Sequence, residues 1–449
     1  MEQAIIAIFI LGYLCIALEH IININKTASA LLTGVLCWTL LVFATPSDSL
    51  LSSNLYTGAA AVIGLGNPEF ANMDPSSRYL EFALFELTNH LAAIAQIIFF
   101  LMGAMTIVEL VDAHHGFRFI TDRIRTSRYT TLLWVVCIVT FFLSAILDNL
   151  TTSIVMVSLI RKLVHNHEER MFFAGMVIIA ANAGGAWTPI GDITTTMLWI
   201  GGQITTVSIM KSLFIPSIVC LIAPLIYLTF TMKGKVGPPV HTEYEPVKGS
   251  RLMLFLGVGA LVSVPIFKTY THLPPYMGML LGLGILWVAS ELIHPDLDEA
   301  QKKKYSAAGA LSRIDVPSVL FFAGILLAVA SLETMLTLHN FAELLADVFK
   351  DNRIIITLIG VLSAVVDNVP LVAASMGMYS MDVYPQDHMI WSYLAYCAGT
   401  GGSMLIIGSA AGVAVMGMEK IDFIWYAKRM SLLAMGGYLA GAACFLLMH

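Results

Sequence analysis

The chain has 449 residues, of which 58% are hydrophobic and only 12% are charged. A soluble domain carries about 25% charged residues, so this composition excludes an ordinary soluble protein and indicates an all-α protein that crosses a membrane many times. The net charge is −6 and no basic block occurs, which argues against nucleic acid as a partner.

The six cysteines all lie in apolar stretches and lack the spacing of a disulfide framework or a metal site, so we expect buried thiols. Apolar sequence begins at Ala4 with no basic segment before it, and we expect no cleavable signal. We expect neither a cofactor nor enzymatic activity.

A membrane-spanning helix needs about 17–25 predominantly apolar residues. Eight runs of this kind are predicted to be such helices: 4–22, 27–44, 89–111, 211–231, 251–267, 275–294, 316–338 and 429–447. Residues 45–88 are predicted to form a long external loop, because Pro46, Asn67-Pro68 and Asp74-Pro75 are turn signals. Residues 232–250 are predicted to be a cytoplasmic linker between two halves, 1–231 and 251–449.

Two sequence blocks occur twice in the same order. Residues 143–149 read LSAILDN and residues 362–368 read LSAVVDN, at an offset of 219 positions. Residues 181–193 (ANAGGAWTPIGDI) match residues 398–410 (AGTGGSMLIIGSA) at an offset of 217. Such doubling indicates that one unit was duplicated, and duplicated units with polar breaks in apolar segments are typical of transport sites.

Each predicted repeat contains two unusual segments. Residues 130–163 and 353–380 are apolar on both sides of an Asp-Asn pair, which predicts re-entrant helical hairpins with the pair at the tip. Residues 171–200 and 391–419 are apolar on both sides of a Gly-Gly break, which predicts broken transmembrane helices. Charge counting does not separate a re-entrant hairpin from two full spans.

The positive charges predict the orientation in the membrane. With these segments, all but five of the 24 Lys and Arg residues fall on one side, which the positive-inside rule assigns to the cytoplasm. Both termini are then external and the two repeats are inverted relative to each other. We expect a multi-pass protein of a bacterial inner membrane, in contact with lipid.

Carboxylates inside apolar segments are costly and predict a functional site. Asp148 and Asp367 lie at the two hairpin tips, and Asp192 follows the first Gly-Gly break. The neighbouring polar groups are Asn149, Thr151, Thr152, Asn182, Thr188, Thr194 and Thr195 in the first half and Asn368, Ser403 and Ser409 in the second. Carboxylate, amide and hydroxyl oxygens suit hard cations. The alternative is that Asp-Asn only caps a helix and that the threonines bond to backbone carbonyls.

The two halves are not equivalent, because Asp192 aligns with Ser409. The first half is therefore predicted to hold the primary cation site, and the second half is either a second site or a gate. Another set of polar residues comprises Glu109, Asp112, His114 and Glu333. They are interpreted either as polar helix ends at the membrane interface or as a proton path or pH sensor.

The motifs resemble those of the NhaD-type sodium/proton antiporters of the ion transporter superfamily, over essentially the whole chain. The matching segments are 103–114 (GAMTIVELVDAH), 147–152 (LDNLTT), 181–192, 367–371 (DNVPL) and 396–402 (YCAGTGG) through Ile421-Asp422. The resemblance implies two inverted repeats, a homodimer with scaffold and transport domains, and exchange of Na⁺, with Li⁺ as a further cargo, against H⁺ by alternating access.

The resemblance also implies a coupling mechanism. A carboxyl group in a low-dielectric site holds a proton, and a bound cation favours the charged form, so ion and proton compete. Asp148 and Asp192 are expected to share Na⁺, with Asn149 and Thr188 as neutral ligands and Asp367 as a third titrating group.

The sequence favours two alternative functions less than cation exchange. A sodium-coupled anion or dicarboxylate symporter on the same fold would need a cationic or amide-rich pocket, but no Lys or Arg lies near either tip. The dicarboxylate carriers of the superfamily have Ser-Asn-Thr at the tips, where this chain has Asp-Asn. An intramembrane aspartyl protease would need Gly-x-Gly-Asp, but residues 189–192 read PIGD, and it would leave the doubling unexplained.

Overall fold

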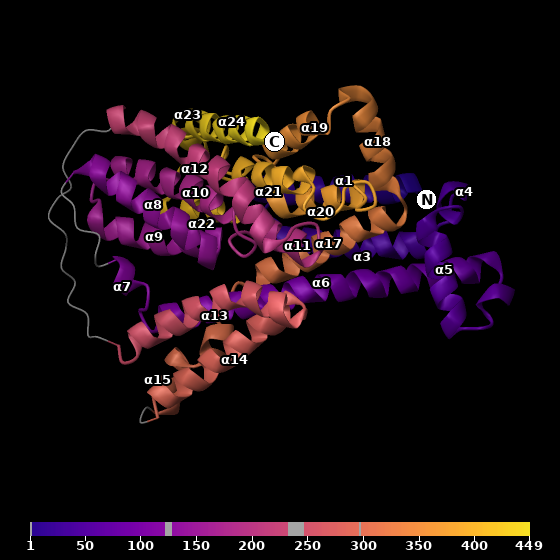
Figure 1. Ribbon diagram of the computed structural model, residues 1–449, viewed down its shortest axis with the longest axis horizontal. Helices are drawn as coiled ribbons and strands as arrows, with labels where there is room; N and C mark the ends of the chain where they lie inside the picture. The colour runs from indigo at the N-terminus through magenta and orange to yellow at the C-terminus, as the bar shows by residue number, and fades with distance from the viewer. Residues whose placement is uncertain (1, 122–127, 232–246, 296–297) are drawn as a thin grey trace. The chain divides into compact units, whose positions relative to one another are not determined.

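The computed structural model describes residues 2–121, 128–231, 247–295 and 298–449, and within them every regular element is a helix (Figure 1). Residues 232–246 of the predicted linker lie outside the described residues. So do four of the Lys and Arg residues that the positive-inside rule assigns to the cytoplasm, namely Arg123, Arg125, Lys233 and Lys235. The all-helical fold class is confirmed for the part of the chain that is described.

Eight helices correspond to the eight predicted apolar runs: α1 (Glu2–Ala17), α3 (Lys26–Val42), α6 (Pro75–Ala113), α12 (Thr206–Thr231), α13 (Ser250–Thr271), α14 (Pro275–Ile293), α17 (Val316–Thr334) and α24 (Ser431–Met448). Among the described residues, seven helices are long and apolar enough to cross a membrane. They are six of these eight, all except α1 and α3, together with α8 (Tyr129–Leu147). Large apolar side chains such as Phe230, Tyr270 and Leu292 are more than two-thirds exposed, at 75%, 83% and 74%. Exposure of such large apolar side chains is unfavourable in water but not in lipid. With the seven helices, it indicates a multi-pass membrane protein.

The prediction of a loop over residues 45–88 is wrong for much of its length. This segment contains α4 (Asp48–Leu51), α5 (Asn54–Gly66), the 3-10 turn η1 (Phe70–Asn72) and the first turns of α6. Asp74-Pro75 begins a helix, because the Asp74 carboxylate accepts hydrogen bonds from the Ser77 hydroxyl at 2.7 Å and the Ser77 N–H at 3.0 Å. These bonds lower the pKa of Asp74, and proline fits a first helical turn because it has no N–H to leave unpaired.

The predicted helix breaks are all present. The first Asp-Asn separates α8 (Tyr129–Leu147) from α9 (Asn149–Leu163), and the first Gly-Gly ends α10 (His167–Gly185) before α11 (Ile193–Ile200). In the second half, α19 (Asn352–Leu362) precedes α20 (Asn368–Met378), and α21 (Met389–Gly401) precedes α22 (Ala410–Glu419). Re-entry of the hairpins and inversion of the repeats stay predictions.

Shorter helices complete the chain. They are α2 (Glu19–Ile22), α7 (Arg118–Thr121), α15 (Glu299–Tyr305), α16 (Ala307–Leu311), α18 (Thr337–Phe349) and α23 (Phe423–Arg429).

The two sequence copies form the same local contacts. The Ser144 hydroxyl donates to the Ala181 carbonyl at 2.6 Å, and Ser363, its counterpart, donates to the Ala398 carbonyl at 2.8 Å. These bonds join α8 to α10 and the residue that follows α19 to α21. The duplicated blocks therefore encode a duplicated structure, a pair of helices joined just before the Gly-Gly break.

The chain forms two compact units, and each takes segments from both halves of the sequence. The first unit comprises residues up to Ile98 with Asp315–Asp351 and Ala373–Val383; the second comprises Phe99–Ile314, Asn352–Val372 and Tyr384–His449. In the first unit α17 packs on α3, where the Trp38 indole N–H donates to the Leu327 carbonyl at 2.8 Å. These units are defined by packing and not by the duplicated sequence. They therefore do not test the predicted division into the halves 1–231 and 251–449.

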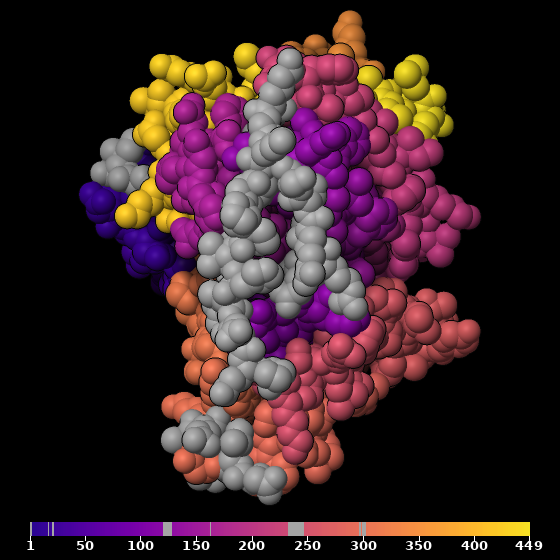
Figure 2. Space-filling model, turned by 90° about the vertical axis from the view of Figure 1, so that its left-hand side faces the viewer, coloured from indigo at the N-terminus to yellow at the C-terminus, as the bar shows by residue number. Residues whose placement is uncertain are grey.

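The second unit brings the broken helices of both halves together. Helix α10 packs on α8, α9, α21 and α22, and α22 also packs on α9. Figure 2 shows yellow C-terminal segments beside violet segments from the first half of the chain. Residues more than 200 positions apart in the sequence therefore meet in one core.

We predict that an added methyl group at Gly184 or Gly401 destabilises the protein. A Cβ at Gly184 would clash with the Phe141 carbonyl oxygen, and one at Gly401 would clash with the Gly360 carbonyl oxygen. Gly184→Ala and Gly401→Ala should each cost about 1–3 kcal/mol, because backbone cannot move aside as a flexible side chain can. The measurement is thermal unfolding in detergent, followed by the reaction of the four buried cysteines, Cys37, Cys137, Cys220 and Cys397, with a thiol dye. The expectation of buried thiols is wrong for Cys15, which is exposed, so its reaction before unfolding sets the baseline.

Gly64→Ala is the matched control, because nothing lies within 4 Å of a Cβ at this helical position. It should leave Tm unchanged or raise it, since alanine favours the helix by about 0.5–1 kcal/mol. Equal Tm values for all three variants would contradict the close approach of the helix backbones.

Candidate functional site

Asp148 occupies the break between α8 and α9 in a strained conformation. Its carboxylate caps α9, accepting the Thr151 N–H at 2.7 Å and the Thr151 hydroxyl at 2.8 Å. Its backbone has φ 119° and ψ 162°, a region that residues with side chains avoid at a cost of about 1–3 kcal/mol. Asp148 therefore does cap α9, but whether it only caps the helix stays untested. A cap alone does not require backbone strain, which is typical of functional sites.

Asp192 caps α11 with one carboxylate oxygen. Its Oδ1 accepts the Thr194 N–H at 2.8 Å and the Thr194 hydroxyl at 2.7 Å. Its Oδ2 accepts a hydrogen bond from Asn149 Nδ2 at 2.6 Å, and the residue is 1% exposed. The carboxylate at the first Gly-Gly break and the amide at the first hairpin tip therefore form one buried site.

Asn182, in α10, joins the two halves of the chain. Its Oδ1 accepts from Asn149 Nδ2 at 3.0 Å, and its Nδ2 donates to Ser403 Oγ at 2.9 Å and Ser409 Oγ at 3.1 Å. Ser409 also caps α22, accepting the Gly412 N–H at 3.2 Å. All of these side chains are buried. Ser403 and Ser409 thus belong to the same network as Asp192, a connection that the sequence did not indicate.

The hydroxyls of the other threonines differ in what they contact. Thr188 donates to the Ala145 carbonyl at 2.6 Å and Thr195 to the Asp192 carbonyl at 2.8 Å, as the capping alternative expects. Thr152, in the first turn of α9, has a buried hydroxyl without a hydrogen-bond partner. An unpaired buried hydroxyl is costly, so this oxygen is a candidate ligand for an ion. The assignment of any threonine as an ion ligand stays a prediction.

The carboxylates interact electrostatically within this unit. When they are ionised, Asp148 and Asp192 repel each other, and so do Asp192 and Asp367. Asn368, which follows Asp367 and begins α20, is buried, with 5% of its surface exposed. Among the described residues, the hydrogen bonds of the Asn149–Asn182–Asp192 network include none from Lys or Arg. A bound cation or proton would therefore relieve the repulsion.

The other predicted residues lie in different surroundings. Glu109 forms an ion pair with Arg313, with Oε1 and Nε 2.5 Å apart. Asp112, one turn on in the sequence, is exposed. His114 is buried, with Nδ1 2.8 Å from the Leu110 carbonyl and its ring against His294 and Tyr305. These contacts give no direct link to the Asp192 network.

Glu333 belongs to the first compact unit, where its carboxyl group interacts electrostatically with that of Glu86. His90 Nε2 lies 4.0 Å from the Glu86 carboxylate and 3.3 Å from the Thr334 hydroxyl. Glu86 and His90 were not among the residues predicted from the sequence. Their spacing of i,i+4 in one apolar helix is the signal that would have found them.

The chain matches the family CitMHS, described as citrate transporter, over residues 5–399. It is 48% identical to sodium/proton antiporter 1 of Arabidopsis thaliana over 452 residues, which cover 100% of this chain and 73% of that protein. It is 42% identical to sodium/proton antiporter 2 of the same plant, with 98% of each chain covered. It is 28% identical to the Na⁺/H⁺ antiporter NhaD of Vibrio cholerae serotype O1, over 99% of this chain and 91% of that protein.

We predict that Asn182→Ala destabilises the protein by about 1–3 kcal/mol, because Asn149, Ser403 and Ser409 each lose a buried hydrogen-bond partner. The thermal unfolding assay in detergent measures the change. Asn54→Ala, at an exposed position of α5, removes the same side chain and should change stability by less than about 0.5 kcal/mol. An unchanged Tm in Asn182→Ala would exclude its central position in the network.

Proposed function

The chain belongs to the CitMHS citrate transporter family, and we propose that it is a multi-pass membrane antiporter that exchanges Na⁺ for H⁺. The relatives named sodium/proton antiporters align with nearly the whole chain and support this function. The observation that carries the proposal is the buried Asp192 carboxylate bonded to Asn149, beside a second carboxylate at the strained Asp148.

The proposed mechanism is competition of Na⁺ and H⁺ for one site. Either a proton or a cation would relieve the repulsion between Asp148 and Asp192. A site that already holds one of these positive ions binds the other more weakly. Na⁺ would be held by these carboxylates with neutral oxygens from Asn149, Thr188 and the hydroxyls of the first turn of α9. Binding of one ion then expels the other, which is the coupling that exchange requires.

Transport further requires that the site face each side of the membrane in turn. We propose alternating access by two inverted repeats, with re-entrant hairpins at Asp148 and Asp367, and we propose Li⁺ as a second cargo. The duplicated contacts of Ser144 and Ser363 support the repeat. We also propose that the protein is a homodimer with external termini in a bacterial inner membrane. The two most identical relatives named above are from a plant.

The family description favours a second candidate, sodium-coupled transport of citrate or another carboxylate. A carboxylate substrate is best bound by Arg, Lys or convergent N–H donors. The network around Asp192 presents carboxylates, and its amide N–H groups already donate to side chains of the protein. An anion would be repelled here, so we place this function second; sodium-driven uptake of labelled citrate into vesicles tests it.

We predict that Asp148→Asn and Asp192→Asn each reduce exchange to background, because each removes a charge that both ions need. The assay is Na⁺-induced dequenching of a pH dye in everted vesicles. Asp148→Gly should also abolish exchange while Tm stays equal or rises, because glycine relieves the strain at φ 119°.

Asp74→Asn is the matched control, because it makes the same change of carboxylate to amide at the exposed start of α6. Asparagine also caps helices well, so exchange and stability should stay normal. Near-normal exchange in either Asp148→Asn or Asp192→Asn would exclude that carboxylate from the coupled site.

A further inference from the structure

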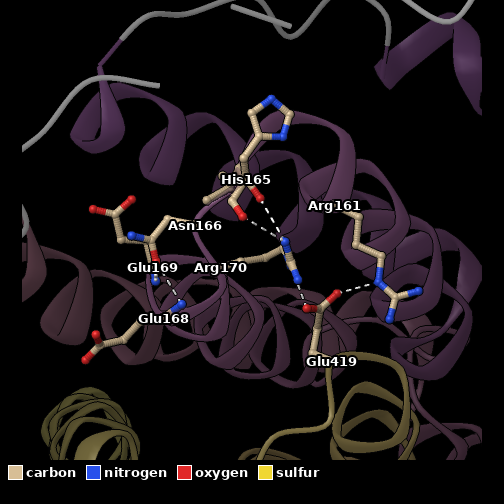
Figure 3. Close-up of polar contacts among 8 residues, drawn as sticks. Arg161, His165, Asn166, Glu168, Glu169, Arg170 and Glu419 are labelled. Atoms are coloured by element: carbon tan, nitrogen blue, oxygen red, sulfur yellow. Dashed lines mark hydrogen bonds and ion pairs between the residues drawn. The ribbon is translucent and has the colours of Figure 1, made fainter. Parts of the chain in front are cut away.

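Glu419 forms a buried ionic cluster with two arginines, which no part of the exchange mechanism above uses. Its Oε1 lies 2.5 Å from Arg161 Nε and its Oε2 lies 2.6 Å from Arg170 Nε (Figure 3). The Glu419 side chain is 0% exposed, whereas those of Arg161 and Arg170 are 45% and 18% exposed. We refer to Arg161, Arg170 and Glu419 as the three-helix clamp.

The clamp joins three helices and one connection. Arg161 lies near the end of α9, Arg170 in the first turn of α10, and Glu419 is the last residue of α22. Arg170 Nη1 also donates to the carbonyls of Val164 and His165, in the connection between α9 and α10, at 3.2 and 3.4 Å (Figure 3). One carboxylate from the second half of the chain thus fixes the turn between two helices of the first half.

The position of Glu419 is costly unless both arginines are present. A negative side chain at the C-terminal end of a helix faces the negative end of the helix dipole. A buried carboxylate also loses its hydration, which only well-placed partners can replace. Each oxygen of Glu419 meets a different guanidinium group. The two ion pairs therefore fix the rotation of α22 about its axis and its position along that axis relative to α9 and α10.

The same three helices meet again at the candidate site. Asn149 is the first residue of α9, Asn182 lies in α10, and Ser409 caps α22. Asn182 bonds to both of the others. The clamp residue of each helix is about three turns, or roughly 15–18 Å, from its site residue. The helices are tied by charges at one end and by neutral hydrogen bonds at the other.

We propose that Glu419 is a positioning residue for Na⁺ binding, acting through the three-helix clamp. Because each helix is rigid over three turns, the register fixed at the clamp sets the positions of Asn149, Asn182 and Ser409 around Asp192. Loss of the clamp lets the helices shift against one another and weakens the ion site without removing any of its ligands. This inference rests on the proposed Na⁺/H⁺ exchange and names a determinant of its affinity.

The test compares Na⁺ dependence in proteoliposomes, with rates referred to the amount of folded protein. Glu419→Gln keeps the shape and removes the charge; we expect KM for Na⁺ to rise roughly three- to thirtyfold while kcat stays within about twofold. Glu419→Asp keeps the charge and should recover part of the affinity. Arg161→Gln leaves the Arg170–Glu419 pair in place, so it should fold and show a smaller rise in KM.

The matched control is Asp422→Asn, three positions beyond Glu419. It makes the same change of carboxylate to amide at an exposed helix cap, where the Trp425 N–H donates to Asp422 Oδ1 at 3.0 Å. Asparagine preserves this cap, so KM should equal that of the unmodified protein.

The outcomes separate this inference from the proposed function. An unchanged KM for Na⁺ in Glu419→Gln would overturn the positioning role. Less folded protein would then indicate a structural role for Glu419, and an altered kcat would indicate a gating role. If Glu419→Gln does not fold, KM in Arg161→Gln decides by the same criterion. If the unmodified protein shows no Na⁺/H⁺ exchange, the proposed function fails and the inference fails with it.

Discussion

A carboxylate buried in a membrane protein must find partners within the protein, because neither lipid nor bulk water can solvate it. Asp192 satisfies this requirement with the N–H and hydroxyl of Thr194 on one oxygen and the Asn149 amide on the other. Asn149 in turn bonds to Asn182, which bonds to Ser403 and Ser409. Solvation of one charge thus involves side chains at the ends of five helices, α9, α10, α11, α21 and α22, from both halves of the chain.

The helix breaks and the close backbone contacts supply the geometry for that network. Each helix that ends at Gly-Gly is followed by a capped helix start, at Asp192 in one copy and Ser409 in the other, with φ of −145° and −144°. Ser144 and Ser363 anchor the broken helices to their neighbours in equivalent ways. Duplication has therefore preserved the scaffold, while the substitution of Ser for Asp confines the charge at this position to one copy.

The sequence predicted the breaks because their chemistry is local: Asp-Asn begins a helix, and Gly-Gly allows backbones to approach. The same local logic failed at Asp74-Pro75, which begins a helix instead of forming a turn. Three features depended on tertiary packing and were out of reach: the positive φ of Asp148, the union of both halves at Asn182, and the buried pairing of Glu419 with Arg161 and Arg170. A charged residue at a helix end looks solvent-exposed in sequence, and only its partners show otherwise.

In the proposed mechanism, Na⁺ and H⁺ compete for the carboxylates of one site. The direct measurement is the release of protons when Na⁺ is added to purified protein in weak buffer, over a range of pH, with choline as the inert cation. Competition predicts proton release at pH values where the site is protonated and none at high pH. The apparent Na⁺ affinity should strengthen with rising pH and then level off. Na⁺ binding without proton release at any pH would contradict competition.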